Sequence, residues 1–157
     1  MKELNRISHL FADLYNGNPW IDVNIMDSLK SLTAEKAAKK VFVKSNSIWM
    51  IVNHMLQWRN NIFKRINGTI LSSPADNYFS EIKDSTEAAW EKLLSDFETS
   101  QQQWISFLKN AGVEKLDAIE TGDTYSSYGF IHGILQHDAY HLGQVAMLVK
   151  QVKNKAG

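Results

Sequence analysis

Histidine is the residue type whose spacing in this sequence points most clearly to chemistry, and two of the five histidines stand out. His137 and His141 are four residues apart, so on a helix they share one face with Cβ atoms about 5–6 Å apart. Two imidazoles at this spacing can bind one metal ion through bonds of about 2.0–2.1 Å. Both continue an apolar stripe, so we expect them to face the interior, where an unpartnered polar group is costly. The same spacing also occurs between histidines that are merely packed.

A third histidine falls on the inward face of a different expected helix. His54 lies about 60° around the helix axis from Ile51 and about 40° from Trp58, at about 100° per residue. Packed helices can therefore bring His54 to His137 and His141. Three neutral histidines without a fourth protein ligand form an open site, which suits catalytic zinc or a related divalent ion. Taken by itself, His54 also fits a core histidine that is hydrogen-bonded within the fold.

The other two histidines are not expected to bind the ion. His132 is five residues before His137, which turns it about 140° away around a helix. His9 is off the apolar stripe of its helix, so we expect it on the surface. A zincin motif needs Glu after its first histidine, where this chain has Asp138. A di-iron carboxylate site needs Glu-x-x-His pairs, and only Asp138 with His141 comes near that pattern.

Composition narrows the class of protein. The chain has 157 residues, and its 17 basic and 17 acidic residues cancel. A neutral chain has no general attraction to nucleic acid or anionic membranes. The absence of cysteine excludes disulfides, thiolate ligands and cysteine nucleophiles. No apolar run approaches about 18 residues, and the start does not resemble a signal peptide. We therefore expect a cytoplasmic protein that binds neither nucleic acid nor membrane.

The spacing of apolar residues predicts four long amphipathic helices. They are expected at residues 3–16, 47–67, 85–110 and 127–152. Shorter helical pieces are expected within 22–40, with Thr33 as an N-cap. The stretches 69–84 and 113–125 are expected to be connections. Four helices with one apolar stripe each bury those stripes best against one another. The sequence therefore predicts an all-α fold, a four-helix bundle with additional short helices in the connections. We expect a single domain over residues 1–157.

Two segments carry a family resemblance that covers most of the chain. Residues 137–144, HDAYHLGQ, are similar to the terminal His-x-x-x-His-x-Gly-Gln segment of the DinB-like superfamily of helical-bundle metalloenzymes. Residues 47–54 resemble the second-helix segment of that family, which ends in its first metal ligand. The resemblance implies a four-helix bundle that holds a divalent metal through His54, His137 and His141. Nickel or zinc is the expected ion, with iron and manganese as further candidates.

The resemblance also implies an activity. Characterised relatives include metal-dependent thiol S-transferases and a thiol-dependent isomerase, in which the metal activates a low-molecular-weight thiol. We therefore expect a metal-dependent enzyme that transfers an external thiol to a small electrophile, and family habit suggests a homodimer. One alternative is a non-catalytic metal- or ligand-binding bundle that acts as a sensor or interaction protein. A further alternative is a helical bundle with three core histidines and no metal.

Several residues are candidates for supporting roles around the metal. Gln144 could hydrogen-bond a ligand or be an ordinary surface amide, and Gly143 is expected to let a neighbouring helix approach. Asp138 could orient an imidazole, but a solvated or interhelical ion pair fits its position better. Arg59 could bind an anionic substrate, although an ordinary ion pair with a packed stem fits better. The aromatic residues that could line a pocket near the metal, or instead belong to the core, are Trp20, Trp49 and Tyr128.

Overall fold

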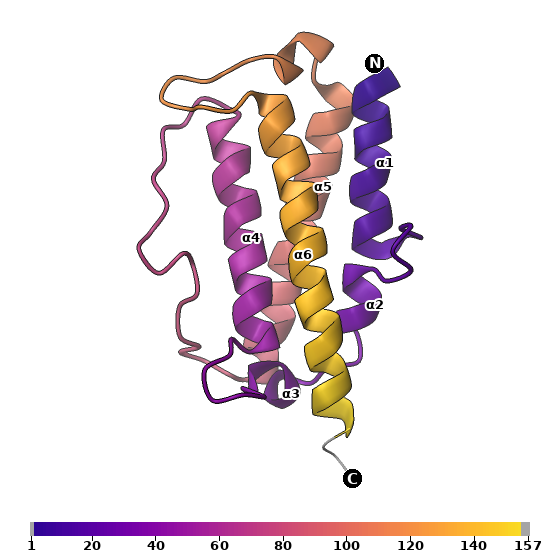
Figure 1. Cartoon of the computed structure of the whole chain (residues 1–157), viewed down its shortest axis with the longest axis vertical. Helices are drawn as coiled ribbons and strands as arrows, with labels where there is room; N and C mark the ends of the chain where they lie inside the picture. The colour runs from indigo at the N-terminus through magenta and orange to yellow at the C-terminus, as the bar shows by residue number, and fades with distance from the viewer. Residues whose placement is uncertain (1, 155–157) are drawn as a thin grey trace.

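The computed structural model, which describes residues 2–154, is all-helical and has no strand among those residues (Figure 1). This confirms the predicted all-α fold class. The four long helices are α1 (Lys2–Asn16), α4 (Ile48–Arg65), α5 (Glu87–Asn110) and α6 (Ser127–Asn154). The short elements are α2 (Ile25–Leu29), α3 (Ala34–Ala38) and a 3-10 helix, η1 (Val113–Leu116). None of the described helices is long and apolar enough to cross a membrane.

Side-chain caps set the start of several helices, because their oxygens accept hydrogen bonds from backbone N–H groups that lack a partner in the first turn. The capping residues are Asn24, Thr33, Ser47 and Thr86. Thr86 places the start of α5 at Glu87, slightly after the predicted start at 85. At the far end of α4 the helix stops at Arg65, and Gly68 follows with a φ of +86°, a conformation that favours glycine.

The long helices pack around a common interior. α1 contacts α5, α5 contacts α4, α4 contacts α6, and α6 contacts α1. Figure 1 shows these four helices along one long axis, with the connection from α4 to α5 running beside α4. The apolar stripes of the sequence lie in that interior, as predicted. Their buried members are Leu4, Ile7, Phe11, Leu14, Ile48, Ile51, Met55, Ile62, Ile66, Trp90, Leu93, Phe97, Trp104, Leu108, Ile134, Val145, Leu148 and Val152.

A polar layer divides the apolar interior into two clusters. Three of the buried polar residues that stand between members of the two clusters, each on a different helix, form this layer: Arg59 on α4, Gln101 on α5 and Asp138 on α6. Arg59 Nε donates to Asp138 Oδ2 at 2.8 Å, and its Nη2 donates to Gln101 Oε1 at 2.8 Å. Gln101 Nε2 then donates to the carbonyl of Phe11 on α1 at 3.1 Å. One chain of hydrogen bonds therefore joins all four long helices.

The Arg59–Asp138 ion pair is interhelical and fully buried, with side-chain exposures of 1% and 0%. The ion pair expected for Arg59 and the interhelical pair considered for Asp138 are confirmed, whereas a solvated Asp138 and an anion-binding Arg59 are excluded by this burial. The guanidinium also lies 4.9 Å from the ring centre of Phe97 and 5.6 Å from that of Phe11, in cation–π range. These contacts offset part of the cost of removing the charge from water.

Replacing one partner of this pair should be far more damaging than replacing both. Arg59→Met leaves a buried carboxylate without its counter-charge and should lower the free energy of unfolding by about 3–5 kcal/mol. The double variant Arg59→Met with Asp138→Leu should recover much of that loss. Urea denaturation followed by circular dichroism measures both. As a control, Lys92→Met removes the exposed Lys92–Asp96 pair and should cost less than about 1 kcal/mol. A double variant as unstable as the single one would contradict this account.

Candidate metal centre

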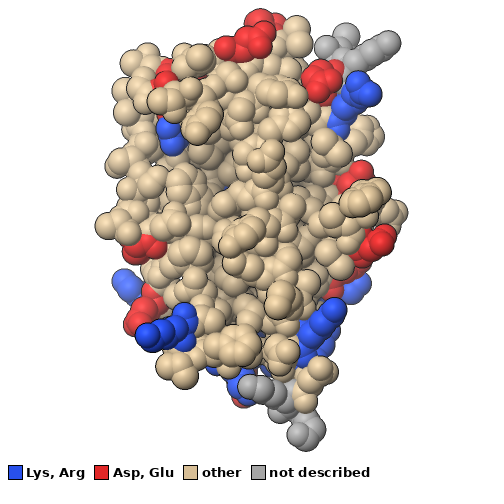
Figure 2. Space-filling model, viewed as in Figure 1, with Lys and Arg blue, Asp and Glu red and all other residues tan. Residues whose placement is uncertain are grey.

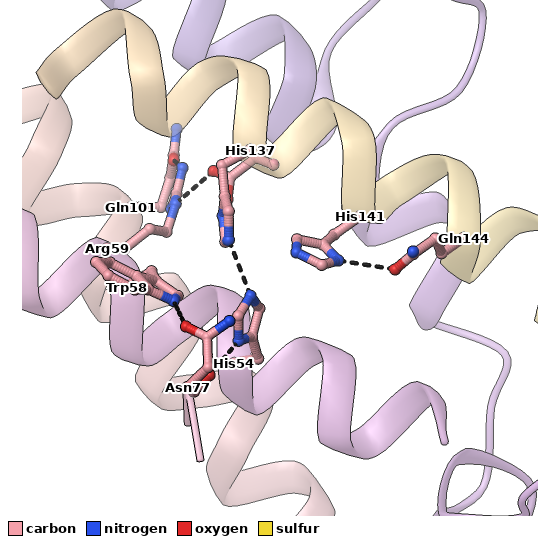
Figure 3. Close-up of polar contacts among 9 residues, drawn as sticks. His54, Trp58, Arg59, Asn77, Gln101, His137, His141 and Gln144 are labelled. Atoms are coloured by element: carbon pink, nitrogen blue, oxygen red, sulfur yellow. Dashed lines mark hydrogen bonds and ion pairs between the residues drawn. The ribbon is translucent and has the colours of Figure 1, made fainter. Parts of the chain in front are cut away.

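Three imidazoles from two helices converge at one point between α4 and α6 (Figure 3). His54 is on α4, and His137 and His141 are on α6; one ring nitrogen of each lies within 4.8 Å of the others. His54 Nε2 and His137 Nε2 are 2.9 Å apart. The convergence expected from helical spacing is therefore confirmed. It arises because α4 and α6 pack directly against each other and because residues four apart share one face of α6.

The outer nitrogens of two of these rings are held by oxygen acceptors. His54 Nδ1 is 2.7 Å from the backbone carbonyl of Asn77, and His141 Nδ1 is 2.8 Å from Gln144 Oε1. A carbonyl or amide oxygen only accepts, so Nδ1 of each ring carries the hydrogen. The Nε2 atoms of neutral His54 and His141 are therefore unprotonated. Of the two roles considered for Gln144, the structure selects contact with an imidazole over a free surface amide.

The third imidazole faces the polar layer of the core. His137 Nδ1 lies 3.7 Å from Asp138 Oδ1, and among the described residues neither buried atom has a hydrogen-bond partner. If Nδ1 of His137 carries the hydrogen, the partial positive charge of this N–H group lies toward the Asp138 carboxylate. That tautomer leaves Nε2 of His137 unprotonated as well, 2.9 Å from Nε2 of His54. At 3.7 Å the contact is longer than a hydrogen bond, so the hydrogen bond that Asp138 makes is the one with Arg59, and its orienting effect on the imidazole stays a prediction.

This arrangement fits a divalent cation. With hydrogens on all three Nδ1 atoms, three lone pairs face one space, and two of them would repel at 2.9 Å unless a positive charge lies between them. Two nitrogens that share an ion through bonds of about 2.0–2.1 Å can lie up to about 4 Å apart. Neutral imidazoles suit zinc, nickel, copper and iron. The donor set, with the tautomers of His54 and His141 fixed by oxygen acceptors, thus fits a metal site, and the residues that would hold the ion are His54, His137 and His141.

Burial keeps two of the imidazoles, those of His54 and His141, in the neutral form that binds metal. His54 is only 2% exposed, and desolvation lowers its pKa from 6.5 to about 4. The neighbouring imidazoles lower it further, while the Asn77 carbonyl and Asp138 act in the opposite direction. Burial also lowers the pKa of His141, against the effect of its bond to Gln144. At neutral pH both rings are therefore acceptors at Nε2.

A cavity of about 480 Å³ surrounds the three histidines, and we call it the histidine pocket. It is lined, besides the histidines, by Asn46, Trp58, Asn77, Phe79, Tyr140 and Gln144. Phe79 stacks on His54, with ring centres 3.9 Å apart and planes inclined by 7°. The side chain of His137 is 24% exposed, so the pocket can be reached from solvent on its side.

The connection between α4 and α5 contributes residues that the sequence analysis missed. Asn77 uses its backbone carbonyl for His54 and its side-chain Oδ1 to accept a hydrogen bond from Trp58 Nε1 at 2.9 Å. Asn77 and Tyr78 both have positive φ, +51° and +62°, which is costly for a non-glycine residue. The Tyr78 hydroxyl accepts a hydrogen bond from Asn61 on α4, which helps hold this strained turn. Asparagine's tolerance of positive φ was the available sequence signal.

The aromatic residues expected near the metal lie elsewhere. Trp49 is buried in the core against Trp90, with ring centres 5.1 Å apart. Tyr128 is 43% exposed and packs against His132 near the start of α6, with ring centres 4.3 Å apart. Trp20 is 97% exposed on the turn before α2, so it belongs neither to a pocket at the metal nor to the core. Of the two roles considered, the core role is confirmed for Trp49, and none of the three residues lines the histidine pocket.

Two further expectations concern glycine and the remaining histidines. Gly143 is exposed, and a Cβ atom added there would meet no described atom within 4 Å, so it does not serve the approach of a neighbouring helix. His9 is exposed, as predicted. His132 is outside the group of three ring nitrogens, also as predicted.

The lowered pKa of His54 should make the metal-free protein less stable as the pH falls. Between pH 6.5 and about 4 the unfolded chain binds a proton at His54 that the folded chain does not bind, so the free energy of unfolding should drop by roughly 3 kcal/mol over this window. Urea titrations in the presence of a chelator measure it. His54→Gln should flatten the dependence, while His9→Gln on the surface should leave it parallel to wild type. Parallel curves for all three proteins would contradict the burial effect.

Comparison with known proteins places the chain in a family. No curated protein and no solved structure was found to match it. A family model does match, the DinB family, and it covers residues 1–152. The three histidines that converge in the structure lie within this matched region, as does the HDAYHLGQ segment on α6. The chain therefore belongs to the DinB family.

Proposed function

We propose that this chain is a divalent-metal-dependent enzyme, built as a four-helix bundle, that transfers a low-molecular-weight thiol to a small electrophile. The observation that carries the proposal is the convergence of three imidazoles at one place, with two of them, His54 and His141, held at Nδ1 by oxygen acceptors. Membership of the DinB family supports the same assignment. The step from a metal site to thiol transfer rests on analogy with relatives.

The residues around the site have distinct parts in this proposal. An ion held by neutral imidazoles lowers the pKa of a bound water or thiol and supplies a nucleophile near neutral pH. His54, His137 and His141 would hold it. Asn77 and Gln144 fix the orientation of two of these rings. The chain contains no cysteine, so the thiol must come from outside.

The open character of the site favours an enzyme over a purely structural or sensing module. Among the described residues, no fourth His, Cys, Asp or Glu joins the group of three. Structural zinc sites are usually closed by four protein ligands, whereas catalytic sites keep a position for water or substrate. The histidine pocket of about 480 Å³ leaves room for such a ligand. A non-catalytic ligand-binding bundle remains the second candidate, and activity assays separate the two.

The proposal also covers the location of the enzyme, its class of substrate, its oligomeric state and its metal. We place the enzyme in the cytoplasm, with a small-molecule substrate and as a homodimer. The neutral balance of 17 basic and 17 acidic residues supports a substrate other than nucleic acid. Nickel or zinc is the proposed ion, since both accept imidazole ligands, and iron or manganese are the alternatives. Mass measurement during size-exclusion chromatography tests the dimer.

Metal analysis tests the first half of the proposal. Wild-type protein purified without a histidine tag should carry close to one divalent ion per chain, and metal should raise its melting temperature. The double variant His137→Ala with His141→Ala should lose both effects, because it keeps only one of three ligands. His9→Ala, on the surface, is the matched control and should behave as wild type. Metal-free wild type that takes up neither nickel, zinc nor iron above about pH 7 would refute the site.

Removing the amide that orients His141 should weaken metal binding without abolishing it. Gln144→Leu deletes the 2.8 Å contact to Nδ1 and should lower metal affinity by about 10- to 100-fold. Competition with a chromogenic chelator measures the change. Gln136→Leu, an exposed glutamine on the same helix, should leave the affinity unchanged. Equal affinities for the two variants would show that the amide does not position the ring.

Thiol assays test the second half of the proposal. Metal-loaded wild type, offered a panel of low-molecular-weight thiols and small electrophiles, should consume the thiol faster than the same concentration of free metal. Thiol loss can be followed with a colorimetric reagent. The metal-depleted His137→Ala, His141→Ala protein gives the background rate. A wild-type protein that binds metal but gives no rate above free metal with any pair would favour the non-catalytic alternative.

A further inference from the structure

A second cavity lies directly beside the histidine pocket, and we call it the aromatic pocket. It has a volume of about 400 Å³ and lies toward the start of α6. Its main walls are Trp58, Ile62, Tyr125, Phe130, Gly133 and Ile134. His137 also lines it, and both Trp58 and His137 line the histidine pocket as well. A ligand in the aromatic pocket would therefore touch the imidazole of a proposed metal ligand.

The walls of the aromatic pocket are fixed by interactions outside it. The indole N–H of Trp58 donates to Asn77 Oδ1 at 2.9 Å, and its ring meets that of Tyr78 edge to face. Phe130 lies under the Arg65 guanidinium, 4.7 Å from the ring centre, and packs against Tyr125 with ring centres 5.6 Å apart. Arg65 is itself paired with a carboxylate. Binding here would cost little side-chain ordering, which favours a genuine binding site.

The chemistry of the aromatic pocket suits an uncharged apolar group. No Asp, Glu, Lys or Arg is among the described residues that line it. Between residues 127 and 149 the only such residue on α6 is Asp138, which is buried. Figure 2 shows the wider setting: on the face that carries α6, the described charged side chains lie toward the edges and the middle is uncharged. Aromatic walls of this kind bind flat or branched apolar groups by surface burial and ring stacking.

Glycine at position 133 keeps this hollow open. It lies on the pocket wall, and a Cβ atom added there would meet no described atom within 4 Å. Glycine inside a helix costs roughly 0.5–1 kcal/mol relative to alanine, and no close packing in the described structure requires it here. The room that it leaves is part of the aromatic pocket.

A third cavity on the opposite side of the histidine pocket has a different character. It measures about 390 Å³ and includes Phe42, Met147 and Leu148, but also Lys44 and the amides of Asn46 and Gln144. A basic side chain and several amides suit a ligand with polar or anionic groups. The two flanking cavities therefore differ in the ligand chemistry that they would accept, and only the aromatic pocket is free of a formal charge.

We propose that the aromatic pocket binds an aromatic or branched aliphatic group of the small-molecule ligand, whose other end reaches the metal position next to His137. The proposal rests on the proposed function, because that other end must meet a metal-bound centre. It adds the substrate class: an uncharged apolar group attached to a metal-binding or reactive end.

Two probes that share a donor nitrogen test this proposal on cobalt(II)-loaded protein, whose visible absorption reports ligands that bind the ion. Imidazole and 4-phenylimidazole differ by one phenyl ring. Wild type should bind 4-phenylimidazole at least about tenfold more tightly, because the ring is buried in the aromatic pocket. Gly133→Leu should remove this preference by filling the pocket, with cobalt content and imidazole affinity unchanged. Gly143→Leu is the matched control on the same helix and should keep the preference.

The outcomes separate this proposal from the proposed function. Wild type without a phenyl preference, or Gly133→Leu protein that retains it, overturns the aromatic pocket while leaving the metal site intact. Loss of the preference in Met147→Lys but not in Gly133→Leu places the ring in the third cavity and also overturns the proposal.

If wild type binds no metal, the proposed function fails first. Metal-free protein is then tested with 4-fluorobenzyl alcohol, whose ¹⁹F line should broaden with wild type and not with Gly133→Leu; equal lines overturn the pocket.

Discussion

The buried ion pair of Arg59 and Asp138 is the interaction on which both the core and the site depend. It joins α4 to α6, the two helices that carry the three histidines, and Asp138 is the residue next to His137. Any slip of one helix past the other would separate both the pair and the imidazoles. Removing two charges from water costs free energy. Hydrogen bonds through Gln101 to the Phe11 carbonyl and contacts with two aromatic rings offset part of that cost. The same ion pair therefore fixes the relative position of α4 and α6 and the geometry of the histidine site.

The site also depends on a segment without regular secondary structure. α4 and α6 bring the ring nitrogens together, but the direction in which His54 presents its lone pair is set by the Asn77 carbonyl. Two consecutive residues with positive φ hold that carbonyl in place, and hydrogen bonds from Asn61 and Trp58 on α4 stabilise the turn. Backbone strain of this kind persists only where surrounding contacts determine the conformation. The helices α4 and α6 position the three histidines, and the connection between α4 and α5 sets the tautomer of His54.

The parts of the structure that sequence predicted are those that follow from periodicity. A period of 3.6 residues places His54 beside Ile51 on the interior face and puts His137 and His141 together, which is why the long helices and the histidine group were predictable. Periodicity says nothing about a connection, so Asn77 was missed and Trp20 was placed wrongly, since its exposure depends on how the turn before α2 leaves α1. Asp138 lies 100° around the helix from His137, yet its carboxylate still comes within 3.7 Å of the ring, a side-chain conformation that spacing does not determine.

The charge balance around the three imidazoles has a consequence for any ion bound there. Among the described residues, Asp138 is the carboxylate that acts on these imidazoles, and it is already paired with Arg59; the acceptors that hold His54 and His141 are uncharged. Among the described residues that line the histidine pocket there is no Asp or Glu. The protein therefore contributes no net negative charge to the centre, and a divalent ion would keep nearly its full charge of two. An ion held there would act as a strong Lewis acid and would favour anionic ligands such as thiolate or hydroxide, because the protein supplies no negative charge to balance it.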